Sequence, residues 1–152
     1  MLPTPSRSHY TFNLRDMANV VQGLASSDPK AIVNYSKFIK LWAHEFEREF
    51  GDRLISTEDR DWLREQTRSE ITNTFESSPD VTYESARLIF GDFMIPGAEP
   101  RIYAEVDNME NFVGVIEEYL EGYNDRNKKK QMKLVMFLDA CTHVSRICRI
   151  LR

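Results

Sequence analysis

The stretch Ser8–Met17, with the sequence SHYTFNLRDM, contains three signals for the start of a helix, one of which is the spacing of Phe12 and Met17, typical of a hydrophobic staple. Asn13 is a favourable N-cap residue, because its side-chain oxygen can accept a hydrogen bond from a backbone N–H of the first turn. Asp16 follows three residues later, where its carboxylate can complete a capping box and lie at the positive end of the helix dipole. The stretch therefore predicts a helix over 13–26, around which the first half of the chain is organised.

Arg15 is the unusual member of this first turn. A cation at the N-terminus of a helix opposes the helix dipole, so it adds nothing to the stability of the helix. One interpretation is a solvated arginine that pairs with Asp16, and the residue types alone favour it. The other is a ligand for an anion such as a phosphate, because backbone N–H groups at a helix start also attract anions.

Composition and charge indicate a folded protein without a strongly charged surface. A chain of 152 residues is long enough for one ordinary domain or two small ones, and 41% hydrophobic residues suffice for a core. The net charge of −4 is evenly divided, with 10 basic and 12 acidic residues in 1–78 and the same numbers in 79–152. We therefore expect no nucleic-acid partner. No apolar run approaches the roughly 18 residues that a membrane span needs, so no membrane partner is expected either.

The cysteines and histidines do not form a metal-binding pattern. Cys141 and Cys148 would lie about 10 Å apart on one helix, too far for a disulfide, which indicates reduced thiols of a cytosolic protein. His143 would point about 200° away from them, so these three residues do not share a face. His44 begins the pair H-E of a zinc motif, but position 48 is Arg48 instead of the second histidine. The sequence therefore predicts no metal site.

The spacing of apolar residues predicts three helices with short connections, over 13–26, 29–50 and 57–77. Asp28 and Pro29 are of the types favoured at the N-cap and first position, so the second helix is expected to start there. Ser56 or Thr57 is expected to cap the third helix. Such an arrangement indicates a small helical bundle. Leu14, Met17, Val21 and Leu24 are expected to form the apolar stripe of the first helix.

A boundary is predicted at 77–80, which divides the chain into 1–78 and 79–152. Residues 81–106 are interrupted by two prolines and a glycine, so they predict an irregular connector with a helical turn near 82–90 and an extended segment at 102–106. A fourth helix is expected to start at Asp107, and a fifth to cover 131–151. The apolar residues Leu88, Ile89, Phe90, Phe93 and Met94 are expected to anchor the connector. The predicted fold class is all-α: a small helical bundle, an irregular connector and two long amphipathic helices.

Several blocks of the sequence occur in the order found in one known family. The segment SHYTFNLRD resembles the stretch that leads into the small helical lid of the third AAA+ module in dynein heavy chains. Further blocks span nearly the whole chain, and together they look more like axonemal than cytoplasmic dynein. These blocks are His44-Glu45, Phe50–Leu54, Glu58–Trp62, Phe90–Met94, Glu118–Leu120 with Tyr123-Asn124, and His143–Ile147.

The resemblance implies roles for two residues. In that family, the arginine that matches Arg15 is the sensor-II arginine, which implies a contact between Arg15 and a phosphate of ATP. Tyr103 resembles the loop beside the adenine of the fourth module, although the residue types favour an aromatic packing anchor. By the same resemblance, 1–78 would be the lid of the third module, and 79–152 would be the part of the fourth module that precedes its phosphate loop.

The resemblance also implies a function, a set of partners and a place in the cell. The chain would be a fragment of a dynein-like microtubule motor ATPase, whose lid couples nucleotide state to movement between modules. The parent motor would use ATP and ADP with magnesium. Its partners would be the other AAA+ modules of the same heavy chain, dynein light and intermediate chains, and microtubules. It would lie in the cytoplasm and cytoskeleton, in the axoneme of a cilium or flagellum.

The isolated chain is expected to have no catalytic residues and no bound nucleotide, because it contains no GxxxxGK[ST] phosphate-binding motif. Lys128–Lys130 is most simply a solvated turn, with a contact to an acidic tubulin surface as the alternative. For the whole chain, the alternative to a motor fragment is a free-standing helical adaptor that binds partner helices in a groove. An adaptor should bury its apolar surface when alone, whereas a motor fragment should expose apolar patches.

Overall fold

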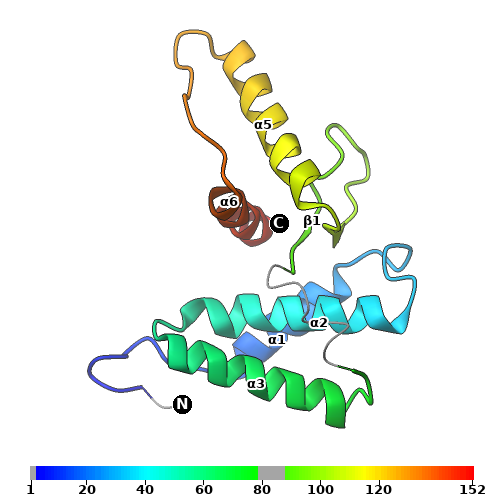
Figure 1. Cartoon of the computed structure of the whole chain (residues 1–152), viewed down its shortest axis with the longest axis vertical. Coiled ribbons are helices and arrows are strands. Elements are labelled where there is room, and N and C mark those ends of the chain that lie inside the picture. The colour runs from blue at the N-terminus through cyan, green and yellow to red at the C-terminus, as the bar shows by residue number, and fades with distance from the viewer. Residues whose placement is uncertain (1–2, 79–87) are drawn as a thin grey trace. The chain divides into compact units, whose positions relative to one another are not determined.

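The computed structural model describes residues 3–78 and 88–152, which divide into two compact units, one ending at Leu88 and the other beginning at Ile89 (Figure 1). The described residues form five α-helices, one short 3-10 helix and a sheet of two very short strands. The all-α prediction is therefore confirmed. The boundary predicted after residue 78 adjoins 79–87, and these residues lie outside the described part of the chain, as does most of the helical turn expected near 82–90.

The first unit, called unit 1, is a small helical bundle. It contains α1 (Leu14–Ala25), α2 (Tyr35–Phe50), the 3-10 helix η1 (Gly51–Arg53) and α3 (Thr57–Asn73). Helices α2 and α3 lie side by side in Figure 1, and the Trp42 ring of α2 lies 4.9 Å from the ring of Phe75, just after α3. Ser56 caps α3 as predicted, although the helix ends four residues earlier than expected. The core of unit 1 contains Val20, Ile39, Leu41, Ala43, Leu54 and Ile71.

The second helix begins later than predicted. Asp28 starts a turn instead of a helix, and its carboxylate accepts a hydrogen bond from the backbone N–H of Lys30 at 2.8 Å. Helix α2 starts only at Tyr35, where Asn34 is the N-cap and its side chain accepts the N–H of Lys37 at 2.8 Å. Asp28 and Asn34 are both favourable N-cap types, and a β-branched pair that is unfavourable in helices separates them. The prediction of a start at Asp28 was wrong for this reason.

A buried carboxylate lies between α1 and α2. Glu45 of α2 is only 1% exposed, and a Cβ atom built on Gly23 of α1 would overlap its carboxylate. The imidazole of His44 is also buried, and its Nε2 lies 3.9 Å from Glu45 Oε1. Gly23 therefore permits the two helices to approach with Glu45 enclosed between them.

Gly23→Ala is expected to lower the free energy of unfolding of unit 1 by about 1–3 kcal/mol, the usual cost of overpacking a core. Alanine is the better helix former by about 1 kcal/mol, but the enclosed Glu45 side chain has no solvent into which it can move. The matched control is Gly114→Ala in α5, because a Cβ there meets no atom within 4 Å. Thermal melts of both variants provide the measurement, and a Gly23→Ala variant as stable as the unsubstituted chain would contradict the prediction.

The second unit, called unit 2, packs two helices against the connector. Strands β1 (Phe90–Gly91) and β2 (Ala104–Glu105) pair antiparallel, so the predicted extended segment is present. Helix α5 (Met109–Arg126) follows, capped by Asn108 rather than by Asp107, and the last helix is α6 (Leu138–Leu151). Three of the predicted anchor residues are buried. The core cluster contains Ile89, Phe93, Val106, Phe112, Ile116 and Cys141.

The last helix is shorter than predicted, because residues 131–137 have no regular secondary structure. The side chain of Asn124, near the end of α5, holds the beginning of this segment. Its Oδ1 accepts the backbone N–H of Met132 at 2.7 Å, and its amide donates to the Met132 carbonyl at 2.9 Å. Phe137 precedes α6 without a side-chain cap. The prediction of a helix over 131–151 was therefore wrong over its first seven residues.

Candidate functional site

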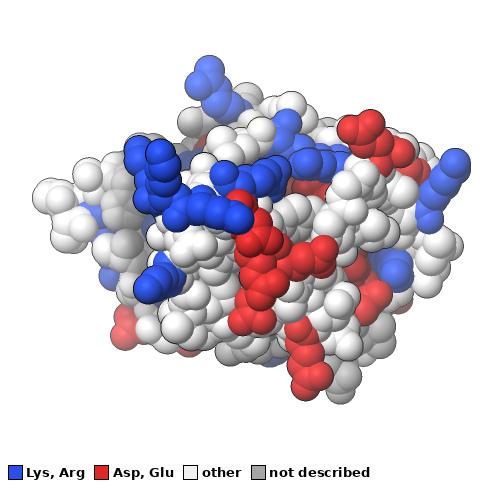
Figure 2. All heavy atoms as spheres, turned by 90° about the horizontal axis from the view of Figure 1, so that it is seen from above, with Lys and Arg blue, Asp and Glu red and all other residues white. Residues whose placement is uncertain are grey.

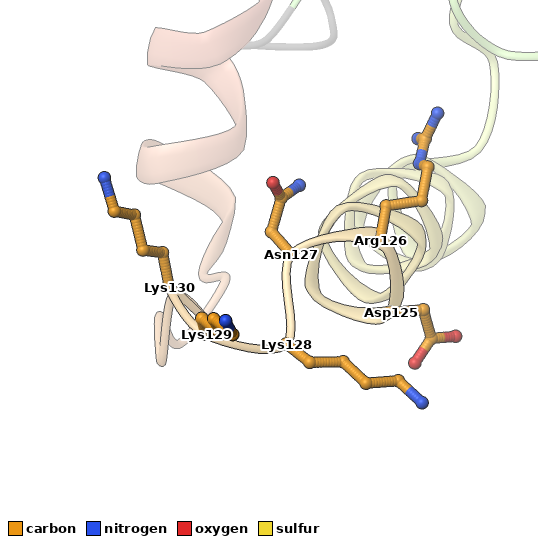
Figure 3. A pocket seen from close by; sticks show the side chains of 6 residues that line it. All are labelled: Asp125, Arg126, Asn127, Lys128, Lys129 and Lys130. Atoms are coloured by element: carbon orange, nitrogen blue, oxygen red, sulfur yellow. The ribbon is translucent and has the colours of Figure 1, made fainter.

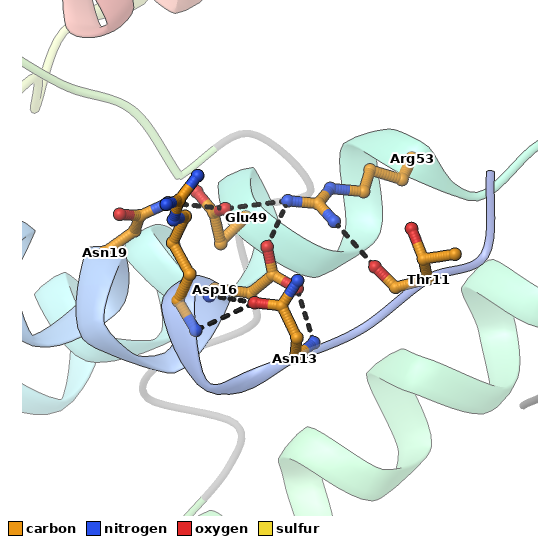
Figure 4. Close-up of polar contacts among 7 residues, drawn as sticks. Thr11, Asn13, Asp16, Asn19, Glu49 and Arg53 are labelled. Carbon is orange, nitrogen blue, oxygen red and sulfur yellow. Dashed lines mark hydrogen bonds and ion pairs between the residues drawn. The ribbon is translucent and has the colours of Figure 1, made fainter.

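The start of α1 has the predicted capping geometry (Figure 4). The side-chain oxygen of Asn13 accepts the backbone N–H groups of Arg15 at 2.8 Å and Asp16 at 3.3 Å. In return, Asp16 Oδ2 accepts the N–H of Asn13 at 2.7 Å, which completes the capping box. Because these first-turn amides already have an acceptor, an anion at this end of α1 would be bound mainly by side chains.

Asp16 forms its ion pair with a residue far away in the sequence. Its carboxylate is buried, and Asp16 Oδ1 accepts a hydrogen bond from Arg53 Nη2 of η1 at 2.6 Å (Figure 4). The same nitrogen donates to Glu49 Oε1 at 2.9 Å, and Arg53 Nη1 donates to the Thr11 carbonyl at 3.2 Å. The proposed pairing of Arg15 with Asp16 is therefore not the arrangement in the structure.

Arg15 itself is exposed. Its backbone N–H is used in the helix cap, but within the described residues its guanidinium makes no hydrogen bond or ion pair. At 100° per residue, Arg15 lies as far around α1 from the exposed Leu14 as from the buried Asp16. The residue is thus a cation that is free to meet a ligand from outside unit 1.

The exposed side of α1 is apolar. Leu14 is 87% exposed, Met17 50% and Val21 61%, whereas Asp16 and Val20 on the other side are buried. We call Leu14, Met17 and Val21 the α1 face. Three of the four residues of the predicted apolar stripe are therefore exposed, since α1 turns its more polar side inward. Among its described residues, unit 1 therefore presents an exposed apolar surface on α1, the helix that also carries Arg15.

The segment before α1 is fixed to the start of α3. The Tyr10 ring is buried, and its hydroxyl donates to Asp59 Oδ2 at 2.9 Å and accepts the N–H of Ile55 at 3.0 Å. Arg7 Nη1 donates to the same Asp59 oxygen at 2.7 Å. Hydrogen bonds from Ser56 and Tyr10 and the charge of Arg7 hold the pKa of Asp59 below its usual value.

Two carboxylates make the stability of unit 1 sensitive to acid. The pKa of Asp16 is also lowered, first by the hydrogen bond from Arg53 and then by the N–H of Asn13. A carboxyl group with a lower pKa in the folded state stabilises the fold above its unfolded pKa of about 3.9, and this contribution disappears as the pH falls through the folded pKa.

We therefore expect the stability of unit 1 to be nearly constant between about pH 7 and pH 5 and to fall below about pH 4. Urea unfolding at a series of pH values, followed by tryptophan fluorescence, measures this dependence. In the double variant Asp16→Asn with Asp59→Asn, the free energy of unfolding should depend less steeply on pH below about pH 4, because the two carboxyl groups that titrate there are absent. A loss of stability that began near pH 6 would point to histidine titration and contradict the assignment to these two carboxylates.

Tyr103 is a packing residue in the structure. It is 3% exposed, the guanidinium carbon of Arg152 lies 4.4 Å from its ring centre, and the Phe90 ring lies 6.0 Å away. A nucleobase would contact this ring only after Arg152 had moved aside. The thiol of Cys141 is buried, which raises its pKa, and both cysteines are free. Among the described residues, no group of three histidine, cysteine or carboxylate side chains has the arrangement of a metal site.

The basic turn after α5 does not gather its charges at one point. In Figure 3, the side chains of Lys128 and Lys130 point in opposite directions, and every side chain that lines this hollow, from Asp125 to Lys130, is exposed. Acidic and basic side chains occur together on the face drawn in Figure 2. These observations agree with a solvated turn. No helix in the described ranges is both long enough and apolar enough to cross a membrane.

Comparison with known proteins places the bundle of unit 1 in a family. The family model described as the AAA+ lid domain matches residues 1–85, more than half of the chain, and the chain belongs to this family. The chain is 41% identical over 152 residues to dynein axonemal heavy chain 1 of Homo sapiens, and 40% identical over 167 residues to the human axonemal heavy chain 12. Each alignment covers the whole of this chain, but the chain spans only 4% of the length of heavy chain 1 and 5% of the length of heavy chain 12. The resemblance to axonemal dynein heavy chains is thus confirmed.

The sequence analysis singled out Arg15 but not Arg53, which binds Asp16, Glu49 and the Thr11 carbonyl beside the start of α1. The only sequence signal was that Arg53 lies in the block Phe50–Leu54 that resembles dynein. Nothing in the spacing of residues connects position 53 with position 16, because that contact depends on how η1 packs on the start of α1.

Proposed function

We propose that this chain is part of a dynein-like microtubule motor ATPase, in which the AAA+ lid couples the nucleotide state of its module to movement of the next module. The observation that carries this proposal is the α1 face. A self-contained adaptor would turn such residues inward, whereas a lid needs an apolar side on which a larger subdomain docks. The capped, rigidly held start of α1 supports the same role, because a coupling element must move as one body.

Arg15 fits the part of a phosphate contact in this proposal. Its side chain is exposed and makes no hydrogen bond or ion pair within the described residues, and it follows Leu14 of the α1 face in the first turn of the same helix. A subdomain that covered this face would bring a nucleotide bound at its own surface within reach of Arg15. Guanidinium groups bind phosphate oxygens through charge-assisted hydrogen bonds. A contact present in only one nucleotide state would supply the free-energy difference that moves the lid.

The remaining parts of the proposal follow from the similarity to axonemal dynein heavy chains. Residues 1–78 would be the lid of the third module, and 79–152 the leading segment of the fourth, with Tyr103 near the adenine of that module. ATP, ADP and magnesium would be bound by the parent motor. Its partners would be the other modules, microtubules, and light and intermediate chains, in the cytoskeleton of a ciliary or flagellar axoneme.

The proposal is tested by the accessibility of the α1 face in two settings. Val21→Cys is labelled with a maleimide in the 152-residue chain and in an axonemal dynein heavy chain that carries this segment in place of its own. Mass spectrometry identifies the labelled peptide. Because docking removes the thiol from solvent, we expect labelling to be about tenfold slower in the heavy chain, with different rates in ATP and ADP.

The matched control is Glu65→Cys on the solvent-facing side of α3, which is expected to react rapidly in the isolated chain. It shows whether the reagent and the fold are intact. A free-standing adaptor would leave Val21→Cys equally reactive in both settings and with both nucleotides. That result would overturn the proposed coupling role.

A further inference from the structure

The carboxylate next to Arg15 in the sequence is fully engaged elsewhere. Asp16 is 4% exposed, its Oδ1 accepts from Arg53 at 2.6 Å, and its Oδ2 accepts from the backbone of Asn13 at 2.7 Å. The charge of Arg15 also lowers the pKa of this carboxyl, but it is the smallest of the causes, after the hydrogen bonds from Arg53 and Asn13. A buried carboxylate that loses its cation is strongly unfavourable, so it would recruit another cation within reach.

A second carboxylate on the same side of unit 1 is held by the same arginine. Glu49 Oε1 accepts from Arg53 Nη2 at 2.9 Å and from the Asn19 side chain at 3.0 Å (Figure 4). Arg53 is itself fixed by the carbonyl of Thr11, at 3.2 Å from Nη1. Nη2 of Arg53 therefore donates to both carboxylates while Nη1 donates to the Thr11 carbonyl, so that the planar guanidinium is held from both of its terminal nitrogens.

We propose that Arg53 is a positioning residue for Arg15: by occupying Asp16 and Glu49, it prevents these carboxylates from neutralising Arg15 and keeps the Arg15 guanidinium available to a phosphate. The inference rests on the proposed function of Arg15, but it concerns the chain alone. Arg53 does not touch the ligand. It acts by satisfying Asp16, which leaves Arg15 as an unpaired cation beside the α1 face.

The test is a coupling measurement on the 152-residue chain without nucleotide. The pKa of the Asp16 carboxyl is measured by carbon-detected NMR titration in four proteins: the unsubstituted chain, Arg15→Ala, Arg53→Gln and the double variant. In the presence of Arg53, we expect Arg15→Ala to change this pKa only slightly. In the Arg53→Gln background, Arg15 should have taken over the pairing, so that its removal raises the pKa of Asp16 by about one unit.

The carboxyl of Asp59 is an internal control, because it accepts hydrogen bonds from Arg7 and Tyr10 and not from Arg53 or Arg15. Its pKa should be the same in all four proteins, which separates a specific exchange of partners from general loosening. Arg53→Lys should restore part of the unsubstituted behaviour and serves as the second variant if Arg53→Gln does not fold. In the Arg53→Lys background, Arg15→Ala should then raise the pKa of Asp16, but by less than in the Arg53→Gln background.

An effect of Arg15→Ala on Asp16 that is equal in both backgrounds would overturn the inference, since Arg53 would then not control what Arg15 contacts. The same holds if the Asp16 and Asp59 titrations shift together. This failure is distinguishable from failure of the proposed function, because the accessibility of Val21→Cys in the heavy chain does not depend on the pairing of Asp16. Conversely, the coupling can be present in a protein whose α1 face never docks.

Discussion

Phe112→Ala is expected to lower the free energy of unfolding of unit 2 by about 3–5 kcal/mol, the usual cost of removing a large buried aromatic side chain. Phe112 is fully buried, and its ring lies 5.9 Å from that of Phe93 across the core of this unit. Since the α5 side chain contacts both the connector and α6, no single neighbouring side chain can fill the resulting space.

The two tryptophans allow the two units to be followed separately. Trp42 and Trp62 both lie in unit 1, so tryptophan fluorescence reports the unfolding of unit 1, whereas far-UV circular dichroism reports helices of both units. With Phe112→Ala, we expect an early loss of part of the helical signal at low urea and an unchanged fluorescence midpoint. Each unit has its own buried core, which is the physical reason for this separation.

Phe137→Ala is the matched control, because it removes the same side chain at a position that is 61% exposed. Its effect should stay within about 0.5 kcal/mol, as for most surface substitutions. If Phe112→Ala lowered the fluorescence midpoint to the same extent as the helical signal, the two units would unfold together. If the two variants were equally stable, Phe112 would not be a core residue.

The helix starts that were predicted correctly depend on residues within one turn of each other. The capping box of Asn13 and Asp16 and the cap at Ser56 are of this kind. Local signals fail where two caps compete, as Asp28 and Asn34 do before α2. They also fail where a contact from another element decides the conformation, as the bonds from Asn124 to Met132 do before α6.

The apolar stripe of α1 shows a different limit of sequence patterns. The spacing of Leu14, Met17 and Val21 correctly indicates a helix with one apolar side, but not which surface covers that side. Inside unit 1, α1 packs through Val20, Gly23 and the ion-paired Asp16, and the stripe is exposed. The candidate site was therefore only half predictable: Arg15 was proposed from the family resemblance, whereas the bond between Asp16 and Arg53, 37 residues further along the chain, depends on tertiary packing.

Arg15→Ala is expected to have its largest effect on the motor and almost none on the fold. In the isolated chain, the free energy of unfolding should change by less than about 0.5 kcal/mol, because a first-turn cation without an ion pair contributes little or is mildly unfavourable. In an axonemal dynein heavy chain that carries this segment, the substitution should uncouple nucleotide state from movement, since the lid would lose its contact with the phosphate. Thermal melts of the chain and microtubule gliding by the heavy chain are the two measurements.

Asn13→Ala is the contrasting variant, two positions away in the same turn. It removes the acceptor for the N–H groups of Arg15 and Asp16, so it should cost the isolated chain on the order of 1 kcal/mol whatever nucleotide is present. The guanidinium of Arg15 is retained, and gliding should therefore respond to nucleotide much as before at temperatures where the bundle is folded. If Arg15→Ala instead melted several degrees lower while gliding was normal, Arg15 would be a structural residue and its assignment to a phosphate would be wrong.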